Sequence, residues 1–171
     1  RAAIAKAGQF LYGWEPIPPG FVGDDSLISP VPNSLAWPVS GGIKTQSYGC
    51  VPPFSDGTHY ATSCGNNLWL HNGVDIDAPP CGDQVIASAK GDVMNTGFDG
   101  SFGNFIVIWH ETLGISTIYN HLSSIDVKTG DSIDKADPIA KAGPTGNIQG
   151  NICEGEHLHF MVVPAQVTNQ Y

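Results

Sequence analysis

The chain has 171 residues, the length of one domain with room for a small additional segment. Its net charge is −9 with only seven Lys and Arg residues, which makes it a poor binder of nucleic acid or of an anionic membrane surface. No stretch approaches the roughly 20 apolar residues of a membrane span. The 21 glycines and 13 prolines, together with an apolar fraction of 41%, favour short strands joined by turns around one core.

The first 36 residues differ in composition from the rest. Residues 1–12 have the character of the tail of a helix, and residues 13–36 are rich in proline and linker-like. The compact domain opens at Trp37-Pro38-Val39. We therefore predict an N-terminal helix remnant and Pro-rich linker over 1–36, and a domain over 37–171. The chain begins with Arg1 rather than Met, as expected of a processed protein or of a piece of a longer one.

The four cysteines lie at scattered positions, and none belongs to a Cys-x-x-Cys pair of the kind that binds zinc. An even number at such spacing favours two disulfides and an oxidising compartment. Of the three possible pairings we prefer Cys50–Cys64 with Cys81–Cys153. Four free, buried cysteines in a cytosolic protein are the alternative.

After residue 36 the sequence alternates between strand-like runs and turn signals, with no sustained helical period. This pattern predicts an all-β, antiparallel sandwich or folded-sheet architecture. Residues 48–70 contain the longest irregular stretch, which we expect to form one wall of a groove with Trp69 near its base. The expected strands cover residues 43–47, 74–77, 84–89, 92–96, 104–110, 115–121, 138–142 and 158–163.

His71 and Asp75 are separated by Asn72-Gly73-Val74. On a straight strand four residues span about 13 Å, too far for both side chains to bind one ion. The glycine and the β-branched residues disfavour a helix, whereas Asn-Gly is a strong turn pair. A bend at Asn72-Gly73 would bring the imidazole and the carboxylate to one point. An ordinary polar turn with a surface ion pair is the alternative.

Two further histidine elements lie near the ends of predicted strands. His157 and His159 flank Leu158, so both imidazoles should project from the same strand face while Leu158 enters the core. His121 ends a strand-like run, with Tyr119 two residues earlier on the same face. Each element alone could be a solvated strand end. Together with His71 and Asp75 they provide two His and one Asp for a zinc ion with an open fourth position, and two more histidines for a reacting group.

At these residues the chain resembles the lysostaphin-type (LytM-like) zinc metalloendopeptidases, which cut peptide bonds in bacterial peptidoglycan. The resemblance implies a two-sheet antiparallel β fold with a central groove. It also implies that His71, Asp75 and His159 bind Zn²⁺ and that His121 and His157 are catalytic. The matching motifs, in the family's order, are Trp37-Pro38-Val39, His71 to Pro79, Gly103-Asn104, Tyr119 to Ser123, Val127 to Asp131 and His157 to Phe160.

The chemistry of such a site follows from its components. Zinc lowers the pKa of a bound water to about 7, one histidine accepts and delivers the proton, and the other stabilises the oxyanion. The sequence leaves open which of His121 and His157 has which role. Tyr119 is either an oxyanion partner or, as we prefer, a packed strand residue, and Asp77 is either an outer partner of the site or a solvated side chain. We interpret His59 and His110 as structural or surface residues.

The resemblance further predicts peptidoglycan peptides as substrate and a secreted or cell-envelope location, and the sequence carries no signal for an oligomeric state. A glycine-rich bridge and a stem-peptide linkage both remain candidate bonds, and residues 1–36 are a candidate inhibitory segment. Glu156 stands where the family often has proline, and its carboxylate could raise the basicity of a nearby histidine. Alternative functions are a non-catalytic wall-binding or regulatory domain of the same fold and, less favoured, a biotinyl- or lipoyl-carrier hairpin modified at Lys135.

Overall fold

The computed structural model describes residues 35–53, 57, 60–77, 82–147 and 156–169. These residues form β-strands and no α-helix, which confirms the predicted all-β class. Accordingly, this part of the chain contains no helix with the length and hydropathy needed to cross a membrane. The strands are β1 (Ile43–Gln46), β2 (Gly49–Val51), β3 (Ser63–Gly65), β4 (Leu68–His71), β5 (Val74–Asp77), β6 (Gln84–Ile86), β7 (Gly91–Asp99), β8 (Gly103–His110), β9 (Ile115–Ile125), β10 (Ser132–Ile133), β11 (Pro138–Ala142) and β12 (His157–Val163).

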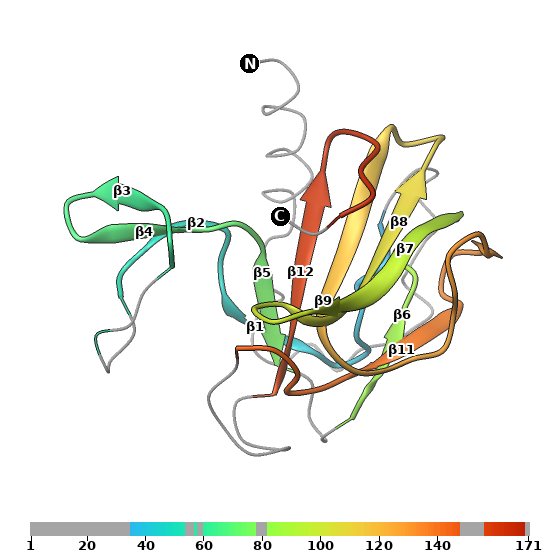
Figure 1. Ribbon diagram of the computed structural model, residues 1–171, viewed down its shortest axis with the longest axis horizontal. Helices are drawn as coiled ribbons and strands as arrows, with labels where there is room; N and C mark the ends of the chain where they lie inside the picture. Colours follow the sequence, from blue (N-terminus) through green and yellow to red (C-terminus); the bar gives the residue numbers. More distant parts are fainter. Residues whose placement is uncertain (1–34, 54–56, 58–59, 78–81, 148–155, 170–171) are drawn as a thin grey trace.

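Most strands belong to one antiparallel sheet with the order β1-β5-β12-β9-β8-β7-β10 (Figure 1). The eleven-residue β9 pairs with β12 and β8 along its first part, and its last residues pair with β11, which in turn pairs with β6. β9 therefore joins the main sheet to a β6–β11 branch. Long runs of Ile, Val, Phe and Tyr in β8 and β9 suit this central position, because β-branched and aromatic side chains pack well on a pleated surface.

The middle strands are buried on both faces. Because side chains alternate along a strand, β12 sends Leu158 and Phe160 into the larger core, whereas Met161 belongs to a smaller core on the opposite face. The β6–β11 branch contributes to the larger core through Val85 and Ile139. The face that carries Met161 also carries the histidines of β12, so the site described below lies beside the smaller core.

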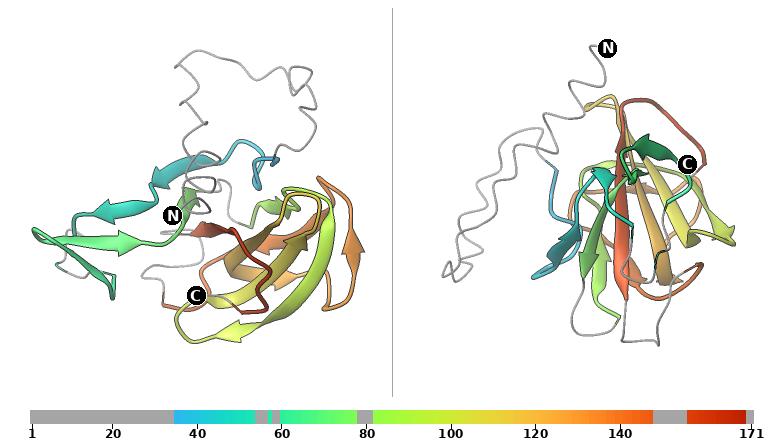
Figure 2. Two further views of the ribbon diagram at one scale, coloured as in Figure 1. Left: turned by 90° about the horizontal axis from the view of Figure 1, so that it is seen from above. Right: turned by 90° about the vertical axis from the view of Figure 1, so that its left-hand side faces the viewer.

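A second, three-stranded sheet with the order β2-β4-β3 projects from the main sheet (Figures 1 and 2). It corrects the expectation of an irregular segment over 48–70. Strand β3 is exposed at all three residues and β4 is only half-buried until its last residue, so these strands lack the apolar alternation that marks a strand in a sequence. The predicted Cys50–Cys64 disulfide is confirmed and joins β2 to β3, whereas Cys81 and Cys153 lie outside the described residues.

The described structure starts just before the predicted domain boundary. Ala36 N–H donates to the Ser88 carbonyl, Trp37 Nε1–H donates to the Gly42 carbonyl, and Val39 is fully buried. The chain is thus bonded to the domain from residue 36 onward. The expected helix remnant and most of the Pro-rich linker lie outside the described residues, so the boundary near residue 36 stays a prediction.

Candidate metal centre and catalytic histidines

The predicted bend between His71 and Asp75 is present. His71 ends β4 in the small sheet, Asp75 lies in β5 of the main sheet, and the chain bends at Gly73 between them. The bend brings His71 Nε2 to 3.2 Å from Asp75 Oδ1. A Cβ atom at Gly73 would lie 2.7 Å from both His159 Nε2 and the Phe160 carbonyl oxygen, so only glycine fits there without displacing β12.

His159 reaches the same point through strand pairing. It lies directly opposite Asp75 in the β5–β12 ladder, and cross-strand neighbours project from the same face. Its Nδ1 lies 2.9 Å from Asp75 Oδ1 and 3.0 Å from His71 Nε2. All three side chains are buried, and the structure brings together the His71, Asp75 and His159 set that the sequence predicted.

This set has the geometry and protonation of a metal site. Tetrahedral ligands at the usual zinc–nitrogen distance are about 3.3 Å apart, close to the 2.9–3.2 Å edges of the triangle formed by the three ligand atoms. His71 Nδ1–H donates to the Ser47 carbonyl, which turns the Nε2 lone pair toward the triangle. Burial would raise the pKa of Asp75, but hydrogen bonds to His159 and His71 lower it well below its usual range. The carboxylate is therefore ionised, as a metal ligand must be.

His121 enters the site through a bulge that the sequence did not reveal. Tyr119 and Leu122 both belong to the larger core, whereas the His121 ring lies 5.0 Å from that of His157 on the other face. The expectation that His121 shares a face with Tyr119 is therefore wrong. His121 has a φ of 62°, and the β8–β9 register shifts in this region. Such a bulge re-aims a side chain, here turning His121 toward the site.

The two remaining histidines of the site have different surroundings. His121 Nδ1–H donates to the Thr145 carbonyl at 2.8 Å, and burial lowers the pKa of His121 to about 4. It is therefore neutral at pH 7, with the Nε2 lone pair available. His157 Nε2 lies 3.6 Å from Asp75 Oδ1, and its side chain is 24% exposed, more than those of the candidate ligand set formed by His71, Asp75 and His159. The site consequently reaches solvent on the His157 side.

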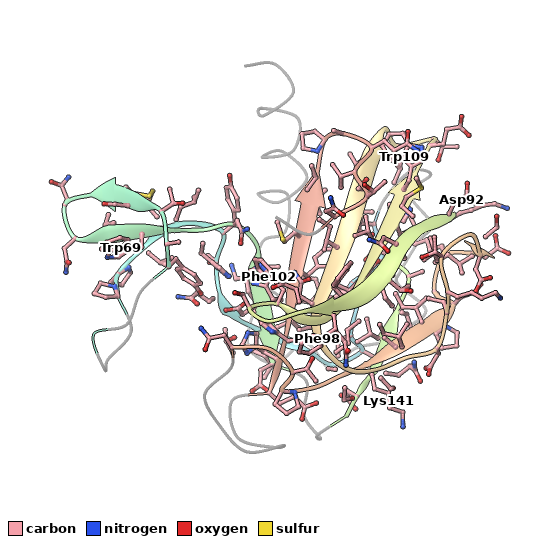
Figure 3. The ribbon with its side chains drawn as sticks, viewed as in Figure 1. Trp69, Asp92, Phe98, Phe102, Trp109 and Lys141 are labelled. Atoms are coloured by element: carbon pink, nitrogen blue, oxygen red, sulfur yellow. A yellow bond between two sulfur atoms is a disulfide. The ribbon has the colours of Figure 1, made fainter. Side chains whose placement is uncertain are left out.

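Two aromatic residues of the site were not predicted from the sequence. The Tyr60 ring stacks on His71 with a centroid distance of 4.7 Å. Burial and the Asp75 carboxylate raise the pKa of its hydroxyl, which stays protonated. The ring centroid of Phe102 lies 5.9 Å from that of His159, beside the paired strands β5 and β12 (Figure 3). The only available signal for Tyr60 was its position between two paired cysteines.

Other candidate residues have structural roles. Tyr119 is fully buried and its hydroxyl accepts a hydrogen bond from Ser88 N–H, which supports the packed interpretation over the oxyanion one. His110 is also fully buried, so it is a structural rather than a surface residue. Glu156 Oε1 accepts from Gly82 N–H, and burial raises the pKa of Glu156. The contact identified for this carboxylate is thus a loop amide, which gives no support to the idea that it tunes a histidine.

Comparison with known proteins agrees with this site. The profile of peptidase family M23 matches residues 70–170, more than half of the chain. The chain belongs to peptidase family M23. This membership confirms the resemblance drawn from the motifs and the metalloendopeptidase class of the domain, and it leaves the carrier-hairpin alternative at Lys135 without support.

Individual M23 proteins of known name are similar over the same region. The peptidoglycan DD-endopeptidase ShyB of Vibrio cholerae is 38% identical over 93 residues, which are 54% of this chain and 20% of that protein. The DD-carboxypeptidase/endopeptidase Mpg of Neisseria meningitidis is 36% identical over 91 residues, which are 53% of this chain and 19% of that protein. The match therefore spans about a fifth of the length of these relatives.

Solved structures share the fold. A zinc-containing peptidase from Vibrio cholerae superimposes with a TM-score of 0.56 and 30% identity, covering 74% of this chain and 35% of that one. The catalytic domain of lysostaphin from Staphylococcus simulans gives a TM-score of 0.56 and 26% identity, covering 75% of this chain and 86% of that one. These similarities confirm the predicted antiparallel two-sheet fold.

Proposed function

We propose that this domain is a zinc-dependent endopeptidase that hydrolyses peptide bonds in bacterial peptidoglycan. The observation that carries the proposal is the convergence of His71, Asp75 and His159 within 4.8 Å of one another, beside the His121–His157 pair. The name of the ShyB relative supports peptidoglycan as the substrate, and the name of the Mpg relative supports a DD-endopeptidase activity. Because both names specify DD activity, a cross-link between two D-amino acids is the bond that we propose first.

His71, Asp75 and His159 would hold the zinc, with two imidazole nitrogens and one carboxylate oxygen as ligands. Bound zinc would lower the pKa of a water molecule and polarise the scissile carbonyl. The donor set fits this ion because all three residues can present lone pairs to one point and Asp75 is ionised. Soft thiolate ligands are absent from this set, and imidazole nitrogen suits zinc.

The hydrogen bond of His121 suggests how the two other histidines divide the catalytic roles. Since His121 Nδ1–H is bonded to the Thr145 carbonyl, its Nε2 can only accept in the neutral state. His121 would take the proton from the attacking water and deliver it to the leaving amine as the carbon–nitrogen bond breaks. His157 would donate a hydrogen bond to the substrate oxygen as negative charge develops there.

The Cys50–Cys64 disulfide supports a location outside the cytoplasm, because such bonds persist in oxidising compartments. The peptidoglycan relatives support the same location. We therefore propose that the domain works at the cell envelope or in the extracellular medium.

The function is tested by zinc content and peptidoglycan digestion for wild type, His159→Ala and His121→Ala. We expect His159→Ala to lose zinc and activity. We expect His121→Ala to keep zinc while its digestion rate falls by about two to four orders of magnitude, the usual range for loss of a general base. Full activity in both variants would disprove the assignment. Binding of peptidoglycan without digestion by the zinc-loaded wild type would indicate the non-catalytic alternative instead.

The bond specificity needs a second assay. Wild-type protein is incubated with a cross-linked muropeptide dimer and, separately, with a pentaglycine peptide. Mass spectrometry of the products then identifies the bond. Cleavage of pentaglycine alone would contradict the DD specificity while leaving the endopeptidase proposal intact.

A further inference from the structure

One short segment after β11 contacts both histidines outside the ligand set. Residues 143–146 run between the β7–β8 hairpin and the end of β9. At the start of the segment, Gly143 forms an isolated antiparallel bridge with His157. Two residues later, the Thr145 carbonyl accepts the hydrogen bond from His121 Nδ1–H. The segment therefore links the backbone of one histidine to the side chain of the other.

The hydroxyl of Thr145 fixes the position of that carbonyl. Thr145 Oγ1 accepts a hydrogen bond from Asn104 N–H at 2.9 Å and donates one to the Leu122 carbonyl at 2.7 Å. Asn104 is the second residue of β8, and Leu122 directly follows His121 in β9. The Thr145 side chain is thus bonded to a strand on each side, and one of its partners is the residue next to the histidine it orients.

Close packing around the segment leaves it little freedom. A Cβ atom at Gly103 would lie 2.3 Å from the Thr145 carbonyl group, and one at Gly146 would lie 2.3 Å from Gly103 N. Both glycines have positive φ values, 67° and 88°, which other residues rarely adopt. A Cβ at Gly143 would lie 2.4 Å from Ser123 Cβ. Backbone therefore packs against backbone on either side of Thr145, and a displaced hydroxyl has few alternative positions.

We propose that Thr145 is a positioning residue for catalysis. Through its hydroxyl it holds its own carbonyl at His121, which keeps the proton on Nδ1 and turns the Nε2 lone pair toward the reacting water. The hydrogen-bond partner of a histidine selects its tautomer, and loss of an outer partner of this kind costs about 10- to 100-fold in activity. This role rests on the proposed function, because it gives Thr145 a task only if His121 accepts a proton.

The test compares zinc-loaded wild type, Thr145→Val and Thr145→Ser, with a cross-linked muropeptide dimer as substrate. Valine keeps the branched shape and removes both hydroxyl hydrogen bonds, whereas serine keeps the hydroxyl. We expect Thr145→Val to lower kcat about 10- to 100-fold with KM changed less than about threefold. We expect Thr145→Ser to remain within about threefold of the wild-type kcat.

Thr117→Val is the matched control. Like the hydroxyl of Thr145, the Thr117 hydroxyl of β9 takes part in two hydrogen bonds, here with His110 and with Tyr119 inside the core. It should lower the melting temperature at least as much as Thr145→Val does and leave kcat within about threefold. Equal losses of kcat in both valine variants would show that general destabilisation, rather than positioning of His121, lowers activity. That result would overturn the proposal.

Nitrogen-15 NMR of the imidazoles provides a direct readout. In wild type, His121 Nε2 should resonate as an unprotonated nitrogen, and Thr145→Val should show a mixture of tautomers. A wild-type His121 with its proton on Nε2 would refute the positioning role even if Thr145→Val fails to fold or to bind zinc.

Activity of His121→Ala separates the failure of the Thr145 proposal from the failure of the proposed function. If His121→Ala and His159→Ala are both fully active, the proposed function itself fails, whereas an inactive His121→Ala beside a fully active Thr145→Val refutes the role of Thr145 alone.

Discussion

Strand β9 contributes to two histidine networks on opposite faces of the same sheet. On one face, Thr117 and Tyr119 join His110 in a chain of hydrogen bonds within the core. On the other, His121 faces His157 beside the ligand set. Both networks contain fully buried histidine, since His110 and His71 are each 0% exposed. Burial of a histidine therefore does not distinguish a metal or catalytic site from a structural one.

The two networks differ in whether their hydrogen bonds close. Because the Lys90 carbonyl can only accept, His110 Nδ1 carries the proton and Nε2 accepts from the single hydroxyl proton of Thr117. The Thr117 hydroxyl also lies 3.1 Å from that of Tyr119, which accepts from Ser88 N–H. Each of these groups has an assigned donor or acceptor, so the chain is complete without a ligand.

In the site, by contrast, the outer nitrogens of two histidines are bonded to backbone carbonyls and their inner nitrogens face the site. His71 and His121 each donate their Nδ1 proton to a backbone carbonyl, Ser47 and Thr145 respectively. Their Nε2 lone pairs are thereby directed into the site, where Asp75 adds a carboxylate. A cluster of acceptors around one point is stable only with a cation or with added protons. His71 and His121 therefore differ from His110 in having an Nε2 lone pair that faces the site rather than a core hydroxyl.

The largest expected effect comes from removing one histidine of each network. His71→Ala should lose nearly all bound zinc and at least about three orders of magnitude in peptidoglycan hydrolysis, because the components of such a site act as a unit. His110→Ala should keep stoichiometric zinc and a kcat within about threefold, while losing about 2–4 kcal/mol of stability through a cavity and an unpaired Thr117. Metal analysis, digestion assays and urea unfolding check both variants. If His110→Ala lost zinc as His71→Ala does, the two networks would not be separate.

An intermediate effect is expected at the glycine that lets the ligand set converge. In Gly73→Ala the new Cβ would lie 2.7 Å from His159 Nε2, so the imidazole or the bend must shift. We expect zinc affinity to fall about 10- to 100-fold, as it does when the support of a ligand is disturbed. Competition with a chelator of known affinity measures this change.

Gly97→Ala is a suitable control for Gly73→Ala, because its Cβ would meet only the edge of the Phe105 ring, at 3.1 Å, on another strand. It should leave zinc affinity unchanged. Wild-type zinc affinity in Gly73→Ala would mean that the crowding at His159 is relieved without cost, and the argument for a tightly fitted bend would fail.

The sequence could predict the parts of the site that depend on local signals, but not those that depend on strand pairing. The alternation around Leu158 placed His157 and His159 correctly, and the Asn-Gly pair placed the bend beside Asp75, because both signals are local. The bulge at His121 escaped prediction because it depends on how β9 pairs with β8 and β11, which are brought together only by the fold. Tyr60 was missed for the same reason, because its contact with His71, the last residue of β4, forms only when the intervening chain folds back.

The small sheet was missed for another reason. A strand is visible in a sequence when one of its faces is buried, and β3 has no buried residue. Its position is set instead by pairing with β4 and by the disulfide. Most strands of the main sheet, such as the almost wholly buried β8, were predicted from residue type because their apolar runs are long and bounded by glycine turns, whereas the two-residue β10 was not.

The smallest expected effect concerns the pH dependence of stability. Burial lowers the pKa of His110 in the folded protein, whereas the unfolded chain has a pKa near the ordinary value of about 6.5. The unfolded state therefore binds more protons just below this value. The stabilisation from a neutral His110 is fully present above about pH 6.5 and is lost as pH falls below it, with a limiting slope of about 1.4 kcal/mol per pH unit.

We expect His110→Asn to remove this contribution while keeping a side-chain N–H near the Lys90 carbonyl. Urea unfolding of metal-free wild type and His110→Asn between pH 7.5 and 5.5 measures the difference, and comparing the two cancels the titration of the site histidines, which both proteins retain. Over this pH range the free energy of unfolding of wild type should fall by about 1 kcal/mol more than that of His110→Asn. Parallel pH profiles would show that His110 is not held neutral, and the hydrogen-bond chain assigned to it, which distinguishes it from His71, would be wrong.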